Sequence, residues 1–324
     1  MVSAHPIGEY TGRERMASYP SGQRDLTVNQ LAQPSGVRIP HSPHVDGDPV
    51  KDIAIELARE AGELIVAGRA GDIAVQNTKS SSVDIVTAVD QASEELLFSR
   101  LEALRPQDGF LGEEGRTKES VSGTTWVVDP IDGTVNFFYN IPHYAVSIAA
   151  VSGDPVPGSW VVEVAVVYNP VTQEMFHASR GEGAFLGDKQ LRITEPPNLG
   201  QALLGTGFAY SDAMRREQAR VLVDILPQFR DIRRQGTASL DFAYVASSRL
   251  DLYYERTLMP WDHAAGELLV TEAGGVIEGL ADMPPGREGI FAGHPTLVHQ
   301  LQELLHELGA DTPLSDVPGW GLDS

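Results

Sequence analysis

The sequence predicts a layered α+β fold. Three observations support this: strand-like and helix-like segments are mixed without a strict strand–helix–strand alternation, the longest apolar runs have the length of buried strands, and 42% of the 324 residues are hydrophobic. A chain of this size and composition can bury a large core, either in one domain or in two joined subdomains.

The first part of the chain is predicted to hold an extension, two helices and several strands. Residues 1–48 show no sustained period and are predicted to be an unstructured N-terminal extension. A helix is predicted from about residue 49, with Ile53, Leu57 and Leu64 on its buried face. Asp90 is placed to cap a second helix at 91–104. Strands are predicted at 124–128, 144–151, 160–168 and 173–178, with turns between them.

From residue 200 onward, strands and helices alternate more evenly. Helices are predicted at 212–229, 237–249, 262–275 and 295–308, and strands at 202–207, 250–255, 275–280 and 289–293. Residues 310–324 are predicted to be a loose C-terminal tail.

Charge and composition exclude several classes of function. The formal charge is −21, from 24 Lys and Arg against 45 Asp and Glu, so nucleic acid is not expected as a partner. No apolar run approaches the roughly 20 residues needed to cross a bilayer, and the N-terminus lacks the pattern of a secretory signal. The chain contains no cysteine, which excludes thiol nucleophiles and fits a reducing compartment. We therefore expect a cytoplasmic protein without membrane partners.

The segment 126–136, WVVDPIDGTVN, is the strongest candidate for chemistry. Asp129 ends an apolar run, Pro130 is expected to stop the strand, and Asp132 returns to the same place. Two carboxylates this close repel, so either one is protonated or a cation, Mg²⁺ above all, neutralises both. The carbonyl of Ile131 could add an uncharged ligand, and Gly133-Thr134 could bring free amides to a phosphate. Taken alone, the string also fits an ordinary turn with side-chain hydrogen bonds.

Two further segments carry acidic residues beside apolar ones. FLGEEG at 110–115 sets two glutamates between glycines, and it could equally be a solvated loop. Asp262 stands at a predicted helix start after Pro260 and Trp261, where it could also be only a helix cap.

Together these segments resemble the inositol monophosphatase family of Mg²⁺-dependent, lithium-sensitive sugar phosphatases. GEE, WVVDPIDGTVNF and WDHAAGELLVTEAGG occur in that order, flanked by KSSSVDIVTAVD, RRQGTASLD and DLYYE, and the resemblance covers approximately residues 50–308. It implies a layered αβαβα sandwich of the inositol monophosphatase and fructose-bisphosphatase type. It also implies a single phosphatase domain at 49–309, built from two α+β subdomains, and a homodimer.

The resemblance also implies roles for individual residues. The implied metal ligands are Glu113, Asp129, Asp132, Asp262 and the carbonyl of Ile131. Thr134 and Asp90 resemble the pair that orients the attacking water with Glu113. Lys79 and Asp84 match a mobile loop that supports a further metal ion, although Asp84 could instead be structural. The implied substrate contacts are Gly133, Thr134, Ala238 and Glu255, of which Glu255 would accept hydrogen bonds from a polyol.

His143, Trp261 and His263 are instead assigned to packing or to satisfied hydrogen bonds. The function expected from all this is Mg²⁺-dependent hydrolysis of inositol monophosphate, a small phosphorylated substrate. Phosphatases of the same fold that act on histidinol phosphate, fructose 1,6-bisphosphate or adenosine 3',5'-bisphosphate remain alternatives. So does a regulatory protein that keeps the fold but works by contacting other proteins.

Overall fold

The computed structural model describes residues 48–69, 75–78, 85–194 and 198–318. Lys79, Asp84 and nearly all of the predicted N-terminal extension lie outside these residues. Asp48 is described, and it caps the first helix because its Oδ1 accepts from the amide of Val50 at 2.9 Å.

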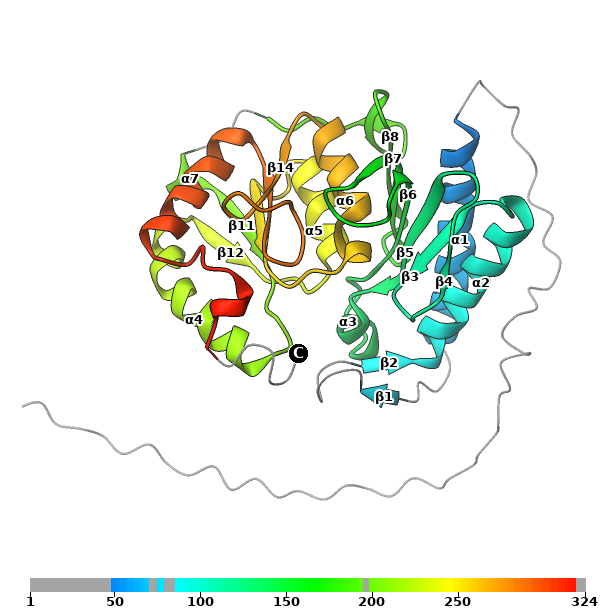
Figure 1. Cartoon of the computed structure of the whole chain (residues 1–324), viewed down its shortest axis with the longest axis horizontal. Helices are drawn as coiled ribbons and strands as arrows, with labels where there is room; N and C mark the ends of the chain where they lie inside the picture. The colour runs from blue at the N-terminus through cyan, green and yellow to red at the C-terminus, as the bar shows by residue number, and fades with distance from the viewer. Residues whose placement is uncertain (1–47, 70–74, 79–84, 195–197, 319–324) are drawn as a thin grey trace, which may run out of the picture.

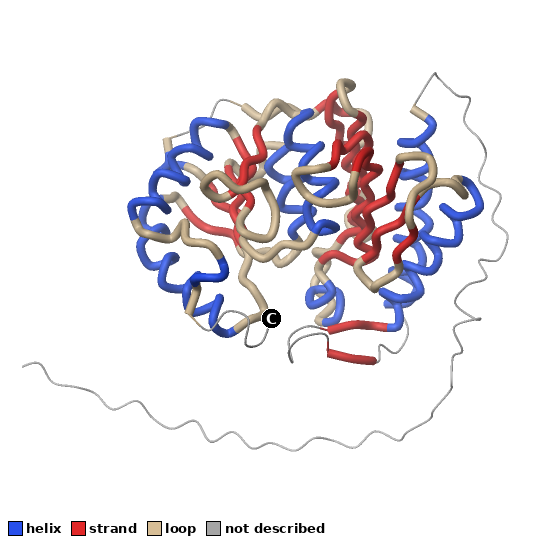
Figure 2. The backbone as a smooth tube through the Cα atoms, in the orientation of Figure 1, coloured by secondary structure: helices blue, strands red, loops and turns tan. Residues whose placement is uncertain are grey.

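The layers follow the predicted αβαβα order (Figure 1). Helices α1 (Pro49–Arg69) and α2 (Ala88–Leu104) cover one face of a first sheet, and α5 (Ala238–Ala246) and α6 (Pro260–Glu272) lie between that sheet and a second one. Helices α4 (Asp212–Ile225) and α7 (Pro295–Glu307) form the far layer. Figure 2 shows the two strand layers, each between helices. The predicted fold class is therefore confirmed.

The first sheet has eight strands in the order β10-β9-β8-β7-β6-β5-β3-β4. All neighbours are antiparallel except β3 and β5, which run parallel. The strands are β3 (Gly109–Gly112), β4 (Thr117–Lys118), β5 (Thr124–Asp132), β6 (Ala145–Gly153), β7 (Trp160–Asn169), β8 (Glu174–Ser179), β9 (Gly183–Leu186) and β10 (Lys189–Gln190). A short helix, α3 (Thr134–Phe138), follows β5. A separate two-stranded sheet joins β1 (Val75–Thr78) and β2 (Ile85–Thr87).

The second sheet has five strands in the order β12-β11-β13-β15-β14. Strand β11 is parallel to both its neighbours, and the other pairs are antiparallel. The strands are β11 (Leu203–Thr206), β12 (Asp231–Arg233), β13 (Leu252–Glu255), β14 (Val276–Gly279) and β15 (Ile290–Gly293), and 3₁₀ turns occur at Leu199–Gln201, Leu226–Gln228 and Leu314–Asp316.

Each interface between layers has its own apolar cluster. Trp126 and Ile148 pack under α1 and α2, Phe242 and Leu268 fill the space between the sheets, and Phe291 packs toward the outer layer. Burying this surface is the main stabilising contribution to such a sandwich. None of the described helices is long and apolar enough to cross a membrane.

The structure corrects two predictions about helices. The buried face of α1 is formed mainly by small residues such as Ala54, Ala58 and Ala61 with Leu57, while Ile53 and Leu64 are only partly buried, because the helix packs closely on β7. Asp90 does not precede α2 but lies inside its first turn, because the helix begins at Ala88.

Two further corrections concern element ends. Pro130 does not end strand β5, which continues to Asp132 through an irregularity between Asp129 and Asp132 that accommodates a residue without an N–H. Residues 310–318 do not form a loose tail, because Leu314 and Val317 are 2% and 4% exposed against the body of the protein.

Candidate active site

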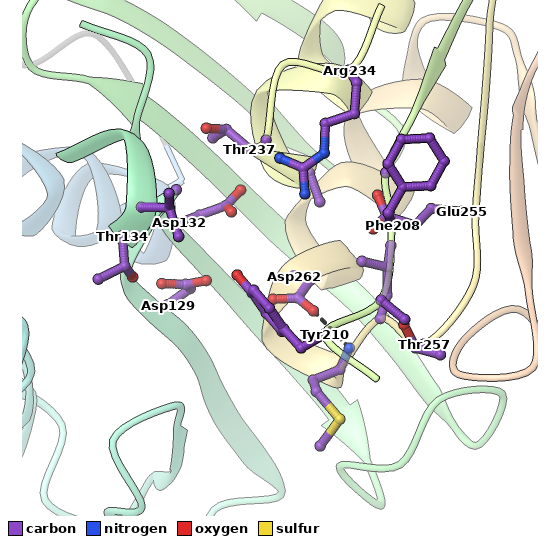
Figure 3. A pocket seen from close by; sticks show the side chains of 18 of the residues that line it. Asp129, Asp132, Thr134, Phe208, Tyr210, Arg234, Thr237, Glu255, Thr257 and Asp262 are labelled. Atoms are coloured by element: carbon purple, nitrogen blue, oxygen red, sulfur yellow. Dashed lines mark hydrogen bonds between the residues drawn. The ribbon is translucent and has the colours of Figure 1, made fainter. Parts of the chain in front are cut away.

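A cavity of about 710 Å³ lies between the two sheets, at the ends of their parallel strands. Its lining includes the four predicted acidic ligands, Glu113, Asp129, Asp132 and Asp262. Figure 3 shows Asp129, Asp132 and Thr134 on one side of this space and Phe208, Glu255 and Thr257 on the other, with Asp262 between them. Carboxylates from three separate parts of the sequence therefore meet at one site.

The pairing of β3 with β5 places Glu113 beside Asp129. The strands are parallel and Gly112 pairs with Val128, so the residues that follow them emerge next to each other at the same edge. The amide of Glu113 also donates to the carbonyl of Val128 at 3.2 Å. Sequence reasoning found both residues but not this register, since β3 looked like part of an acidic loop.

Asp132 is held by the start of α5. Its Oδ2 accepts a hydrogen bond from the amide of Ser239 at 2.6 Å, where unpaired amides and the helix dipole favour a negative charge. Burial nevertheless dominates and raises the pKa of Asp132 from 3.8 to about 6, with Glu113 adding repulsion and Ser239 opposing the rise. This carboxylate is therefore only partly stabilised by the protein around it.

Asp262 lies in the first turn of α6, as predicted, although the helix starts earlier, at Pro260. Its Oδ2 accepts from the amide of Met259 at 2.7 Å, so it does cap the helix. Its pKa is raised well above the usual value by burial, then by Asp132 and Glu113. Asp262 therefore both caps the helix and lines the acidic cavity, two roles that the sequence offered as alternatives.

Asp129 completes the acidic group. Its Oδ1 accepts from the amide of Ile131 at 3.0 Å, and its pKa is raised well above the usual value, first by burial and then by Glu113, Asp132 and Asp262. An all-oxygen set of this kind, with mutual repulsion between buried carboxylates, has the donor chemistry that hard divalent cations such as Mg²⁺ prefer. Within the described parts of the chain, however, no three acidic or histidine side chains converge as a ready-made metal site.

Gly133 and Thr134 follow the two aspartates on the cavity wall. Gly133 has a φ of +92°, and a Cβ on it would lie 2.4 Å from Oγ1 of Thr237, so this position requires glycine. Thr134 starts α3, and its hydroxyl donates to the carbonyl of Ile131 at 3.0 Å. The carbonyl of Ile131, a predicted metal ligand, and the hydroxyl of Thr134, predicted to orient water, are thus hydrogen-bonded to each other.

Asp90 is the predicted catalytic residue that comes from helix α2. It is fully buried at the start of α2, and the lining of the cavity does not include it. Its pairing with Thr134 stays a prediction.

Sequence reasoning missed Glu94, which supports the loop that carries Glu113. Glu94 is 3% exposed, and its carboxylate accepts from the amides of Glu114 at 2.8 Å and Arg116 at 3.3 Å. A Cβ on Gly112 would lie 2.2 Å from this carboxylate, so Gly112 leaves the space it occupies. The helical pattern of 91–104 gave no sign of this role, because Glu94 reads as one of several helix glutamates.

The opposite wall carries Glu255, at the end of β13. The parallel register pairs Thr206 with Tyr254, which places Gly207 beside Glu255, and a Cβ on Gly207 would lie 2.0 Å from the carboxylate. The hydroxyl of Tyr253 donates to Glu255. Burial raises the pKa of Glu255 to about 7, while Tyr253 and Arg234 favour its charged form. The predicted Ala238 lines the same cavity at the first turn of α5.

The remaining lining residues were not singled out from sequence. Arg215 and Arg234 bring positive charge to the cavity, and Phe208 and Tyr210 bring aromatic surface. Figure 3 shows Arg234 reaching down from the top of the view, between Thr237 and Phe208. Arg234 belongs to the flanking segment RRQGTASLD but received no role of its own, and Arg215, Phe208 and Tyr210 lie in α4 and the loop before it, where no motif stood out.

The three side chains assigned to packing have different positions. His263 is fully buried with its Nδ1 2.7 Å from Oε1 of Glu267, which agrees with a packing role. His143 is largely buried, which lowers its pKa, and its ring packs edge-on against Tyr244. Trp261 packs against the central core but also lines the cavity, so its assignment to packing alone was incomplete.

Comparisons with known proteins agree with this architecture. The family model described as "Inositol monophosphatase family" matches residues 46–309. The inositol-1-monophosphatase SuhB of Mycobacterium tuberculosis is 41% identical over 294 residues, which cover 84% of this chain and 99% of that protein. The Nus factor SuhB of Escherichia coli is 39% identical over 260 residues, covering 77% of this chain and 93% of that protein.

A solved structure shows the same fold. The crystal structure of the extragenic suppressor protein suhB from Bartonella henselae aligns with a TM-score of 0.72 at 33% identity, covering 80% of this chain and 98% of that one. The family match covers far more than half of the chain, and the acidic cavity lies within it. The chain therefore belongs to the inositol monophosphatase family, a family of phosphatases.

Proposed function

We propose that the protein is a Mg²⁺-dependent phosphatase that hydrolyses inositol monophosphate to inositol and phosphate by attack of an activated water. The observation that carries this proposal is that Glu113, Asp129, Asp132 and Asp262 line one cavity although they come from three distant segments. The name of the M. tuberculosis relative supports inositol monophosphate as the substrate.

The residues proposed to hold Mg²⁺ are Glu113, Asp129, Asp132, Asp262 and the carbonyl of Ile131. Bound divalent cations would supply the positive charge that lets a phosphate ester approach these carboxylates and would make a water more acidic. The raised pKa values of Asp129, Asp132 and Asp262 support this assignment, because burial and repulsion from neighbouring acidic groups destabilise the charged carboxylates and a cation would relieve that destabilisation.

The chain's own groups would orient the reaction. Glu113 and the Thr134–Asp90 pair would hold the attacking water, and the amides of Gly133 and Thr134 would bind phosphate oxygens. On the facing wall, Glu255 would accept hydrogen bonds from hydroxyls of the polyol, and Ala238 would leave room for its ring. With no cysteine in the chain, a thiol-bound phosphoenzyme is excluded.

The alternatives are separable by experiment. Phosphate release would be measured over inositol-1-phosphate, histidinol phosphate, fructose 1,6-bisphosphate and adenosine 3',5'-bisphosphate, with Mg²⁺ and with a chelator. Preference for inositol-1-phosphate that depends on Mg²⁺ supports the proposal, and preference for another ester replaces the substrate while keeping the chemistry.

A regulatory binding role is the second candidate, because the E. coli relative bears the name Nus factor. Its distinguishing result would be no release of phosphate from any of these esters in saturating Mg²⁺. The complete set of acidic residues around the cavity favours the enzyme, since binding to other proteins would not require it. A homodimer and a cytoplasmic location remain predictions that accompany the proposal.

A further inference from the structure

The C-terminal strap, which we define as residues 310–318, packs behind the wall of the cavity that faces Asp129. Leu314 and Val317 form a buried cluster with Ala209 and Met214, whose exposed fractions are 5% and 1%. Ala209 itself lines the cavity. In Figure 1 the strap is the red segment after α7, which runs back beside α4. The strap lies beyond residues 46–309, the part covered by the family match.

Hydrogen bonds tie the strap to the strand end that carries Glu255. Arg256, the next residue, is 2% exposed and donates from Nη2 to the carbonyl of Thr312 at 2.7 Å. Its Nε donates to the carbonyl of Glu288 at 2.7 Å, and the carboxylate of Glu288 accepts from the amide of Leu314 at 2.7 Å. A buried guanidinium satisfied in this way is costly to release, because each lost partner leaves a charged donor unpaired.

The segment that the strap covers is a loop that is hydrogen-bonded to α4. Residues 207–211 connect β11 to α4 and contribute Phe208 and Tyr210 to the cavity. Arg215 donates to the carbonyl of Ala209 at 2.6 Å, and Gln218 accepts from the amide of Ala209 at 3.0 Å. These bonds fix the loop to α4, whereas Leu314 and Val317 press the loop and the first turn of α4 toward the rest of the wall.

The strap therefore contacts both parts of one wall, the 207–211 loop and the end of β13. Its first residues, Ala310 and Asp311, also contact Leu305 and His306 of α7. The hydrogen bonds of Thr312 and Leu314 and the apolar contacts of Leu314 and Val317 go to this wall, while Glu113, Asp129 and Asp132 project from the first sheet. In the proposed reaction, the phosphate meets the acidic side and the organic part of the substrate meets the wall.

We propose that the C-terminal strap is a positioning element that sets the substrate-binding wall of the cavity, and through it the affinity for the organic part of the phosphate ester. The predicted effect on substrate affinity rests on the proposed function. The prediction that the strap orders the 207–211 loop does not. Strap residues act through Ala209, Met214 and Arg256 and do not touch the substrate themselves.

The test uses the full chain with the double substitution Leu314→Ala and Val317→Ala. A matched control is Leu64→Ala on α1, which removes a partly buried leucine from the cluster between the first sheet and its covering helices and should lower stability without touching the wall. Truncation after Gly309 removes the strap entirely, and truncation after Pro318 is its control because it leaves the strap in place.

For inositol-1-phosphate we expect KM to rise about tenfold in the double variant while kcat changes less than about threefold, since ground-state binding rather than chemistry is lost. Truncation after Gly309 should have at least the same effect, and Leu64→Ala and the truncation after Pro318 should keep the parent KM. A KM within about twofold of the parent in both strap variants would overturn the proposal.

Hydrogen–deuterium exchange read by mass spectrometry provides a readout that needs no activity. We expect faster amide exchange across 203–215 in the double variant and unchanged exchange across 124–133, because only the wall loses its support. Unchanged exchange across 203–215 would overturn the strap's role even in an active enzyme. If the parent protein hydrolyses no ester, the proposed function fails, and the exchange experiment still decides whether the strap orders the wall.

Discussion

Substituting Asp132 by asparagine should stabilise the metal-free protein at neutral and alkaline pH, although it removes a residue proposed to bind metal. Asp132 is 8% exposed, and its pKa is raised to about 6, chiefly by burial and with further repulsion from Glu113. Asparagine keeps the shape of the side chain and can still accept the hydrogen bond from the amide of Ser239, but it carries no charge.

The magnitude follows from the difference between the folded and unfolded pKa values. In the unfolded chain the carboxyl titrates near 3.8, so between 3.8 and about 6 the folded state binds more protons than the unfolded state. The free energy of unfolding therefore falls as pH rises through this window and stays lower above it. At about 1.36 kcal/mol for each pH unit, the loss is about 3 kcal/mol, and the asparagine variant avoids it.

The assay is urea unfolding followed by tryptophan fluorescence, in a chelator, at a series of pH values. The difference between Asp132→Asn and the parent should approach about 3 kcal/mol near pH 8 and shrink toward zero as the pH falls below 3.8. The slope with urea should be the same in both proteins, which shows that the same surface is exposed.

Asp108→Asn is the matched control, because it changes a buried aspartate whose pKa is lowered, not raised, by its surroundings. Burial alone would raise the pKa of Asp108, but hydrogen bonds from Arg105, Ser122 and Trp126 hold it below its usual value, so this substitution should destabilise the protein at pH 8. Our account of the acidic cavity is refuted if Asp132→Asn is no more stable than the parent at pH 8 in the chelator.

Three other predictions concern the proposed reaction. Asp262→Asn should reduce turnover to below about a thousandth, and Mg²⁺ should raise the melting temperature of the parent but not of this variant; turnover near that of the parent in saturating Mg²⁺ would contradict the ligand assignment. Burial raises the pKa of Glu255 to about 7, so this residue loses its proton as pH rises from about 6 to about 8 and can then accept hydrogen bonds at both oxygens. KM for inositol-1-phosphate should therefore fall over this range, and Glu255→Gln should flatten the pH profile of KM. Glu94→Ala should lower kcat/KM about tenfold, because it releases the amides of Glu114 and Arg116. Glu94→Gln is its control, because glutamine retains an acceptor for these amides. An equal loss of kcat/KM in both variants would mean that the charge of Glu94 matters and not its hold on the loop.

The family, the fold class and the acidic residues of the cavity could be predicted from the amino-acid sequence alone. Asp129 and Asp132 could be singled out because a short spacing after an apolar run forces two carboxylates together, whatever the rest of the chain does. The helices and most strands were equally visible, since their apolar periods arise from local geometry.

Which side chains from distant segments line the cavity, and which contacts hold them in place, depends on the three-dimensional fold. The register that sets Glu113 beside Asp129 depends on a parallel pairing, and the contacts of Glu94 depend on where α2 meets a loop. The strap was predicted to be a tail because its three hydrophobic residues, Ala310, Leu314 and Val317, show no period. The burial of Leu314 and Val317 depends on contacts with Ala209 and Met214, about a hundred positions earlier in the chain. Local patterns report backbone preference and burial, whereas pairing between segments far apart in sequence is set by the packing of the whole molecule.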